Sequence, residues 1–211
     1  MSKPFRILLM ASGNGSNAVN LIEHSRGFDV CGLISDQPQA PVIEKSRALG
    51  IETFVLPRLS TKADHEKQIL KTITQLNPDL ICLCGYMRLL SSDFLSKLSS
   101  PDYLGLAKMI NIHPSLLPSF KGLDAYEQAF AAGVKTAGVT LHFVAPEMDG
   151  GPIILQRSFE RLDTDSLEDF KTRGLKLEHQ LYLECLDLFT KKHINLRKTG
   201  NSFYVSTSHK N

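Results

Sequence analysis

An amide and an imidazole stand two residues apart in the segment Asn111–Gly122, which reads N-I-H-P-S-L-L-P-S-F-K-G. The mostly apolar run 106–110 before it predicts a buried strand, and on an extended chain Asn111 and His113 point to the same face. Pro114 disfavours helix at His113 and ends the strand there. Strand ends of this kind carry the ligand sites of open α/β sheets. A structural reading stays open, in which the histidine is a core residue and the asparagine caps a turn.

Asp149 could supply a carboxylate to this pair. It lies in E-M-D-G-G-P, where an aspartate before two glycines is first of all a turn residue. If the turn folds over the sheet edge, Asp149 holds His113 and favours its protonated form. An amide, a protonatable imidazole and a carboxylate together can stabilise an oxyanion and move a proton. Ser115 lies in no G-x-S-x-G elbow, and no metal-binding spacing such as H-E-x-x-H occurs, which leaves acyl transfer without a covalent enzyme nucleophile.

A glycine-rich turn, S-G-N-G-S-N at Ser12–Asn17, joins the first predicted strand to the first predicted helix. Its two glycines allow a close backbone approach, and the helix start offers free N–H groups to a phosphate. Ser16 and Asn17 can cap this helix, bind the anion, or do both. The dinucleotide fingerprint is incomplete because Ala18 stands where its third glycine is expected, so a plain tight turn is the alternative reading.

Strands and helices alternate along the rest of the chain. The patterns predict strands at 5–10, 30–34, 52–56, 79–84, 138–144 and 153–159, and helices at 18–24, 40–49, 62–76, 91–98, 124–132 and 165–190. Alternation of this kind predicts an α/β fold with an open, mostly parallel, twisted sheet and helices on both faces. The last two strands read as an antiparallel hairpin, a long helix follows, and the tail reads as a small hairpin around Gly200-Asn201 with polar, frayed final residues. The loops 13–17, 85–90 and 111–122 are expected at the carboxyl edge of the sheet.

Composition sets the class of protein. With 211 residues, 42% hydrophobic and 22% charged, the chain fits one domain, 1–211, with a C-terminal appendage at about 191–211. Lysine plus arginine is 24 against 22 acidic residues, which indicates no nucleic-acid partner. No run approaches a membrane span, the N-terminus leads into a strand rather than a signal sequence, and four cysteines are too few for a disulfide framework. We expect a cytoplasmic protein.

Three motifs together resemble one family. N-I-H-P-S-L-L-P at Asn111–Pro118, H-F-V-x-x-x-x-D-G-G-P-I-I at His142–Ile154 and S-G-N-G-S-N at Ser12–Asn17 resemble the phosphoribosylglycinamide formyltransferases, the folate-dependent formyl transferases of purine synthesis. The resemblance covers about residues 5–190 and implies a Rossmann-like formyltransferase fold. The first motif is shared with other 10-formyltetrahydrofolate enzymes, whereas the Ser12–Asn17 loop and the short chain favour glycinamide ribonucleotide as acceptor. The connection 99–108 is longer than is usual in the family.

The resemblance also implies roles for particular residues. Asn111, His113 and Asp149 would be catalytic; Gly15, Ser16 and Asn17 would hold the ribonucleotide phosphate; Glu178 would lie near the ribose and glycinamide; and Lys62, Met87, Arg88, Leu89, Leu90 and Asn111 would bind the folate. Of these, Lys62 reads more readily as a solvated lysine at a helix start than as a folate contact. The implied co-substrate is 10-formyltetrahydrofolate, with no metal, and the implied assembly is a monomer or a homodimer.

The implied reaction is direct attack of the glycinamide amine on the formyl carbon. Asn111 and protonated His113 would hold the tetrahedral oxyanion, Asp149 would orient and charge His113, and a water would relay the proton to the departing folate nitrogen. Formyltetrahydrofolate deformylase and methionyl-tRNA formyltransferase share the central motif. The first resembles a longer chain with an N-terminal regulatory domain, for which we expect no room before Phe5, and the second has a basic C-terminal domain, for which the tail after Thr190 is short.

Two readings from other classes stay in view. The chain could be a nucleotide- or phosphate-binding module without catalysis, a reading that a missing Asn111, His113 or Asp149 would favour. It could also be a nicotinamide dehydrogenase, which the incomplete glycine fingerprint disfavours.

Overall fold

The computed structural model describes residues 3–200 and 202–207. The chain forms two compact units, the first ending at Ile110 and the second beginning at Asn111. The helices are α1 Ser16–Glu23, α2 Pro41–Ala48, α3 Lys62–Leu76, α4 Ser92–Ser96, a 3₁₀ helix Pro101–Tyr103, α5 Ala125–Ala131 and α6 Leu167–Thr190. The strands are β1 Phe5–Met10, β2 Phe28–Ser35, β3 Thr53–Val55, β4 Leu80–Leu83, β5 Met109–His113, β6 Thr136–Phe143, β7 Ile153–Glu160, β8 Ile194–Thr199 and β9 Ser202–Thr207.

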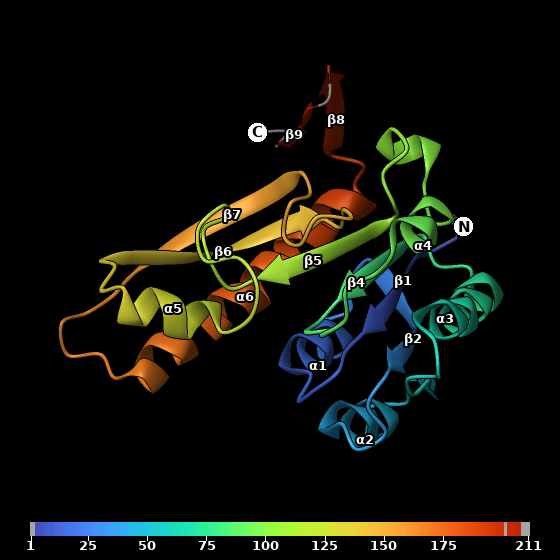
Figure 1. Cartoon of the computed structure of the whole chain (residues 1–211), viewed down its shortest axis with the longest axis horizontal. Helices are drawn as coiled ribbons and strands as arrows, with labels where there is room; N and C mark the ends of the chain where they lie inside the picture. Colours follow the sequence, from blue (N-terminus) through green and yellow to red (C-terminus); the bar gives the residue numbers. More distant parts are fainter. Residues whose placement is uncertain (1–2, 201, 208–211) are drawn as a thin grey trace. The chain divides into compact units, whose positions relative to one another are not determined.

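Parallel strands form the sheet of the first unit, in the order β3-β2-β1-β4 with the start of β5 beyond β4. Strand β1 pairs with β2 on one side and β4 on the other, and its residues Ile7–Met10 are all buried. Such a run is typical of a parallel strand covered on both faces. Figure 1 shows α1 and α2 on one side of β1 and β2 and α3 on the other. The glycine loop after β1 and the loop after β4 therefore begin side by side.

The second unit holds the end of β5, followed by β6 and β7. Strands β6 and β7 are antiparallel, with a register shift between Leu141 and His142. Helix α6 packs along both of them (Figure 1) and begins with a capping box formed by Ser166 and Asp169. Strands β8 and β9 form a separate antiparallel pair. The α/β class, the mostly parallel sheet, the hairpin and the long helix predicted from the sequence are confirmed.

Most element boundaries differ by one to three residues from the sequence predictions. The helix predicted at 62–76 is found unchanged, because Thr61 caps its start and Asn77 ends it in a left-handed conformation. Of the two roles left open for Ser16 and Asn17, helix capping is not found, because Gly15 is the N-cap residue of α1 and makes no side-chain capping hydrogen bond. The tail hairpin is present as β8 and β9, while Asn201 of its turn and residues 208–211 lie outside the described residues.

Three of the four cysteines are buried core residues, and Cys31 is half-buried. Cys82 and Cys84, which the sequence placed in an apolar strand, are buried, and the four cysteines are free thiols. Across residues 3–200 and 202–207, no group of histidine, cysteine and acidic side chains could hold a metal ion. No helix in that described part is long and apolar enough to cross a membrane.

An aromatic cluster holds α5 and α6 together in the second unit. The ring of Phe170 on α6 meets Tyr126, Phe130 and Phe159 with centroids 5.1–6.0 Å apart. Tyr126 approaches α6 at Gly174, where an added Cβ would lie 2.3 Å from the tyrosine hydroxyl oxygen. That hydroxyl donates to Glu178 Oε1 at 2.6 Å. The glycine therefore leaves the space that lets a buried tyrosine reach a buried carboxylate.

We expect Gly174→Ala to lower the stability of the protein, although alanine is the better helix former. The added methyl group would displace a ring that is packed and hydrogen-bonded, and overpacking of this kind costs about 1–3 kcal/mol. The midpoint of thermal unfolding measures the effect. Thr172→Ala, at an exposed position on the same helix, is the control for helix propensity alone and should leave the midpoint unchanged or higher. A Gly174→Ala midpoint at or above that of the wild type would contradict the packing argument.

Candidate active site

The end of β5 carries the two residues that the sequence paired. Asn111 is half-buried and His113 is 4% exposed. The His113 Nε2 atom lies 2.8 Å from the carbonyl oxygen of Phe120. Phe120 reaches this position with φ at 51°, a left-handed conformation that is uncommon for a bulky residue. The loop after β5 therefore folds back on the histidine that precedes it.

Asp149 lies in the turn between β6 and β7 and faces this histidine. Its Oδ2 atom accepts a hydrogen bond from the Gly122 amide at 2.8 Å and lies 3.4 Å from His113 Nδ1. The second distance is longer than a normal hydrogen bond and is that of an ion pair. The two side chains are 11% and 5% exposed, so solvent screens the pair little. The structure thus brings Asp149 to His113, as the sequence predicted.

Both ring nitrogens of His113 face oxygen acceptors. The Phe120 carbonyl can only accept, so Nε2 must carry a hydrogen. The ionised carboxylate of Asp149 on the other side also only accepts. A neutral ring with its hydrogen on Nε2 would present the Nδ1 lone pair to this carboxylate, whereas the imidazolium would form an ion pair with it. The geometry favours the protonated ring.

His142 is a further site residue, which the sequence analysis placed only in a strand and a motif. Its Nδ1–H donates to the Phe143 carbonyl at 2.9 Å, so Nε2 presents a lone pair to the Asn111 amide nitrogen at 3.2 Å. Burial lowers the pKa of His142 and outweighs the hydrogen bond to Phe143 and the nearby Asp149 carboxylate, which raise it. His142 is therefore a neutral acceptor that fixes which end of the Asn111 side chain is the donor. A histidine in an apolar strand was the available signal, and it reads equally as core.

Further contacts hold the two loops of this site in place. Lys121 Nζ donates to Glu147 Oε1 at 2.9 Å, and Asp149 has a left-handed backbone with φ at 50°. Gly151 is required, because an added Cβ would lie 1.7 Å from the Phe143 carbonyl oxygen. Ser115 Oγ donates to the Ser119 carbonyl at 2.5 Å. This hydroxyl is thus engaged within its own loop, in keeping with the absence of a nucleophile elbow.

The glycine loop lies in the first unit. Gly15 has φ at 69°, and an added Cβ would lie 2.1 Å from a methyl carbon of Val42, so both conformation and space demand glycine. Because Gly15 caps α1 without a side-chain hydrogen bond, the first N–H groups of that helix lack a capping side chain. Ser16 is half-buried and Asn17 is buried. The loop has the form of an anion site, a helix start preceded by a tight glycine turn.

The loop after β4 presents apolar side chains to solvent. Met87 and Leu89 are 64% and 60% exposed, whereas Leu90 is buried. Large exposed apolar groups on a short loop indicate a binding surface more than a core. Arg88 between them donates through Nε to Asp36 Oδ2 at 2.7 Å. The expected folate-binding residues 87–90 are therefore a loop whose two outward side chains alternate with two inward ones.

Asp36 follows β2, the position at which dinucleotide-binding folds bind the ribose with an acidic residue. Here its fully buried carboxylate already accepts hydrogen bonds from Ser12, Gln37 and Arg88. Burial raises the pKa of Asp36, but the hydrogen bonds from Ser12 and Arg88 outweigh it and hold the pKa below the ordinary value. An engaged carboxylate, together with the missing third glycine, argues against a nicotinamide dinucleotide.

Two remaining predicted residues have different surroundings. Glu178 on α6 is buried in the second unit, and burial together with this carboxylate raises the pKa of Tyr126, which stays protonated and donates to it. Lys62 is the first residue of α3, its side chain is 55% exposed, and its Nζ lies 3.9 Å from Glu66 Oε1. Lys62 therefore lies in the solvated surroundings of a helix-start residue, whereas Glu178 is buried and hydrogen-bonded to Tyr126.

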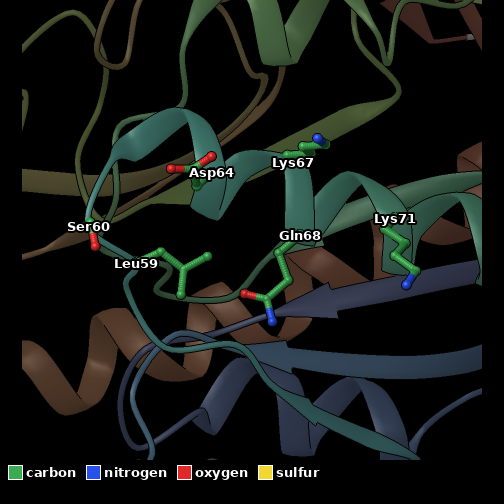
Figure 2. Close-up of a pocket in the computed structure, with 6 residues that line it drawn as sticks. All are labelled: Leu59, Ser60, Asp64, Lys67, Gln68 and Lys71. Atoms are coloured by element: carbon green, nitrogen blue, oxygen red, sulfur yellow. The ribbon is translucent and has the colours of Figure 1, made fainter.

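A shallow hollow of about 610 Å³ lies beside α3 (Figure 2) and contains none of the predicted site residues. Leu59 and Ser60 line it from the preceding loop, and the remaining lining residues, Asp64, Lys67, Gln68 and Lys71, come from the helix. Its lining is that of a helix surface in contact with solvent. The chemistry described above does not involve it.

Comparison with known proteins agrees with the fold and the motifs. A family model described as formyl transferase matches residues 5–186. The chain is 43% identical over 183 residues to the phosphoribosylglycinamide formyltransferase of Bacillus subtilis (strain 168), with 84% of this chain and 90% of that protein covered. The crystal structure of phosphoribosylglycinamide formyltransferase from Anaplasma phagocytophilum superimposes with a TM-score of 0.88 at 37% identity, covering 99% of this chain and 97% of that chain.

A longer relative contains the same unit. The trifunctional purine biosynthetic protein adenosine-3 of Bos taurus is 34% identical over 210 residues, which are 97% of this chain but 20% of that protein. The matches together define the class as a formyl transferase. Within that class the chain belongs to the phosphoribosylglycinamide formyltransferase family, and the resemblance inferred from the three motifs is confirmed.

We expect His142 to make the protein less stable in acid. Because the pKa of the folded-state ring lies below its ordinary value of 6.5, the unfolded chain binds a proton there that the folded protein does not. Stability is retained above pH 6.5 and falls as the pH decreases, by up to about 1.4 kcal/mol per pH unit from this group.

Urea unfolding of the wild type and His142→Gln between pH 8 and pH 5 measures this contribution. Their difference at pH 8 reports packing and hydrogen bonding without protonation, because the ring is neutral in the folded and the unfolded state there. The wild type should lose more stability than the variant on acidification. Parallel curves would show that His142 is not neutral in the folded protein.

Proposed function

We propose that this chain transfers the formyl group of 10-formyltetrahydrofolate to the amine of glycinamide ribonucleotide. The products are formylglycinamide ribonucleotide and tetrahydrofolate, in de novo purine biosynthesis. Enzymes of this family are one-carbon transferases that use 10-formyltetrahydrofolate as co-substrate. The observation that supports the proposal most directly is the arrangement of Asn111, His113 and Asp149, with the imidazole of His113 held between a carboxylate and a carbonyl.

In the proposed mechanism, Asn111 and His113 stabilise the oxyanion that forms when the amine attacks the formyl carbon. His142 accepts one N–H of the Asn111 amide, which leaves the second N–H of that nitrogen to donate to the oxyanion. Asp149 keeps His113 charged and correctly turned. The amine loses its proton through a water to the folate nitrogen, the C–N bond to the folate breaks, and no covalent enzyme intermediate forms.

The Phe120 carbonyl adds a requirement to this mechanism. It occupies the Nε2–H of His113 at 2.8 Å, and Asp149 faces the other nitrogen. The oxyanion must therefore either share the Nε2–H donor with the Phe120 carbonyl or take the place of that carbonyl. A charged oxygen accepts more strongly than a neutral carbonyl, so this exchange favours the transition state over the ground state.

The other predicted residues complete the proposal. The helix start at Gly15, Ser16 and Asn17 would hold the ribonucleotide phosphate, and Glu178 would lie near its ribose and glycinamide. The folate would be bound by Lys62, Met87, Arg88, Leu89, Leu90 and Asn111, with Lys62 offering no more than a solvated charge.

We further propose a cytoplasmic enzyme, either monomer or homodimer, that binds small molecules rather than nucleic acid. Residues 1–211 would act as one formyltransferase domain with an appendage at about 191–211. The family match across 5–186, which includes residues of both units, supports this.

The absorbance change on formation of tetrahydrofolate from 10-formyltetrahydrofolate tests the reaction, measured with and without glycinamide ribonucleotide. Release that requires the ribonucleotide is the expected result. Release without it would identify a deformylase. No release in either condition would overturn the proposal and would make methionyl-tRNA the next acceptor to test.

We expect His113→Ala and Asp149→Asn each to lower kcat by about 10²–10⁴-fold while the fold stays intact. An asparagine at position 149 keeps an acceptor for the Gly122 amide and tolerates the left-handed backbone, so the loss would come from the missing charge. Steady-state kinetics and circular dichroism measure the two effects.

Glu147→Gln is the matched control, because it removes a carboxylate from the same turn. This side chain is 73% exposed and pairs with Lys121, so kcat should stay within about twofold of the wild type. Near-full activity of His113→Ala or Asp149→Asn would refute the assigned roles.

A further inference from the structure

Asp36 is a buried carboxylate outside the catalytic group described above, and it contacts both functional loops of the first unit. It follows β2, and its side chain is fully buried. Its Oδ1 atom accepts from Ser12 Oγ at 2.5 Å, and its Oδ2 atom accepts from Arg88 Nε at 2.7 Å. Ser12 belongs to the glycine loop and Arg88 to the loop after β4. One carboxylate therefore holds two loops that are far apart in the sequence.

Ser12 extends this connection to the backbone of the second loop. The Met87 amide donates to Ser12 Oγ at 2.9 Å, while that hydroxyl donates its own hydrogen to Asp36. The Ser12 amide donates to the Gly85 carbonyl at 3.0 Å. The hydroxyl thus uses its donor on the carboxylate and one acceptor site on the loop. Asp36 reaches the loop twice, once directly through Arg88 and once through Ser12 to Met87.

These two contacts fix how the loop presents its side chains. Met87 and Leu89 point outward, while Arg88 between them turns inward to a buried charge. A charge-assisted hydrogen bond is stronger than a neutral one, and the guanidinium is held in one orientation by it. If Arg88 is released, the loop loses the inward contact that keeps its two apolar neighbours exposed.

We propose that Asp36 is a positioning residue for the folate co-substrate, acting through Arg88 and through Ser12 on the loop 87–90. The inference depends on the proposed function, which assigns this loop to the folate. Asp36 itself does not touch the folate; it holds the binding surface in the shape that binds. Its removal should therefore weaken folate binding and leave the chemical step unchanged.

The experiment measures KM for 10-formyltetrahydrofolate, KM for glycinamide ribonucleotide, kcat, and the dissociation constant of tetrahydrofolate. In Asp36→Asn, we expect KM for the folate and the tetrahydrofolate dissociation constant to rise about tenfold, since an amide has no charge and only one acceptor oxygen to share between Ser12 and Arg88. The value of kcat and KM for the ribonucleotide should stay within about twofold. Binding of tetrahydrofolate is included because KM alone reflects affinity only when chemistry is slow.

Ser12→Ala provides a second variant that removes only a hydroxyl group, so the test stands even if Asp36→Asn fails to fold. It should raise KM for the folate about fivefold, because it removes the contact to the Met87 amide and leaves the Asp36–Arg88 pair in place. Gln37→Ala is the matched control. Its amide donates to the same Oδ2 atom at 3.1 Å but belongs to neither loop, so all four constants should remain those of the wild type.

A double-mutant cycle tests whether Asp36 acts through Arg88. With Arg88→Met already present, Asp36→Asn should raise the tetrahydrofolate dissociation constant by less than it does alone. If the two substitutions have fully additive effects on this dissociation constant, the claim that Asp36 acts through Arg88 is overturned. A folate KM unchanged in both Asp36→Asn and Ser12→Ala, or a fall in kcat with both KM values rising together, would overturn the proposal and indicate a purely structural carboxylate. Absence of ribonucleotide-dependent transfer in the wild type would instead refute the proposed function itself.

Discussion

The carboxylate of Asp149 is the group on which the geometry of the second unit's site depends. It accepts from the Gly122 amide at 2.8 Å, faces His113 at 3.4 Å and lies 3.7 Å from His142 Nε2. The loop after β5 and the turn between β6 and β7 are thus held by one side chain that is 11% exposed. A charge in such surroundings needs partners. Its partners are the Gly122 amide and the imidazole ring of His113.

Two histidines near this carboxylate have opposite roles because their other ring atoms face different groups. His113 has oxygen acceptors at both nitrogens, so the protonated ring satisfies both. His142 donates to a carbonyl at one nitrogen and accepts from the Asn111 amide at the other, and burial lowers its pKa. The surroundings of each ring, rather than the residue type, favour the protonated form at His113 and a neutral acceptor at His142. Together they orient an amide and a charge, which is what stabilisation of an oxyanion requires.

In the first unit, too, one buried carboxylate holds two loops together. Asp36 stands where a dinucleotide-binding fold places its ribose ligand, yet its oxygens are engaged by Ser12, Gln37 and Arg88. In this protein the carboxylate therefore binds groups of the chain itself, where in a dinucleotide-binding fold it would bind the ligand. As a result the glycine loop and the loop after β4 share a hydrogen-bonded support, and the apolar Met87 and Leu89 are left outward.

The helices and strands could be predicted from the sequence alone. Hydrophobic periodicity and turn residues determine them, and both depend only on residues a few positions apart. Helix 62–76, strand β1 and the hairpin of β6 and β7 follow directly from local pattern. The sequence also placed Asn111 and His113 on one strand face, since a strand alternates with a period of two. Together with the three motifs, this placement was enough to predict the family to which the chain belongs.

Contacts between distant segments were decided only by the tertiary structure. No spacing in the sequence shows that the Phe120 carbonyl reaches His113, since a backbone oxygen has no residue type to read. The acceptor role of His142 depends on its burial and on an amide 31 positions away, and Asp36 meets Arg88 across 52 positions. Even the cap of α1, expected from serine or asparagine, is a glycine because the chain must pass within contact of Val42. Local pattern fixes which groups are available, whereas their protonation and orientation follow from packing that brings separate segments together.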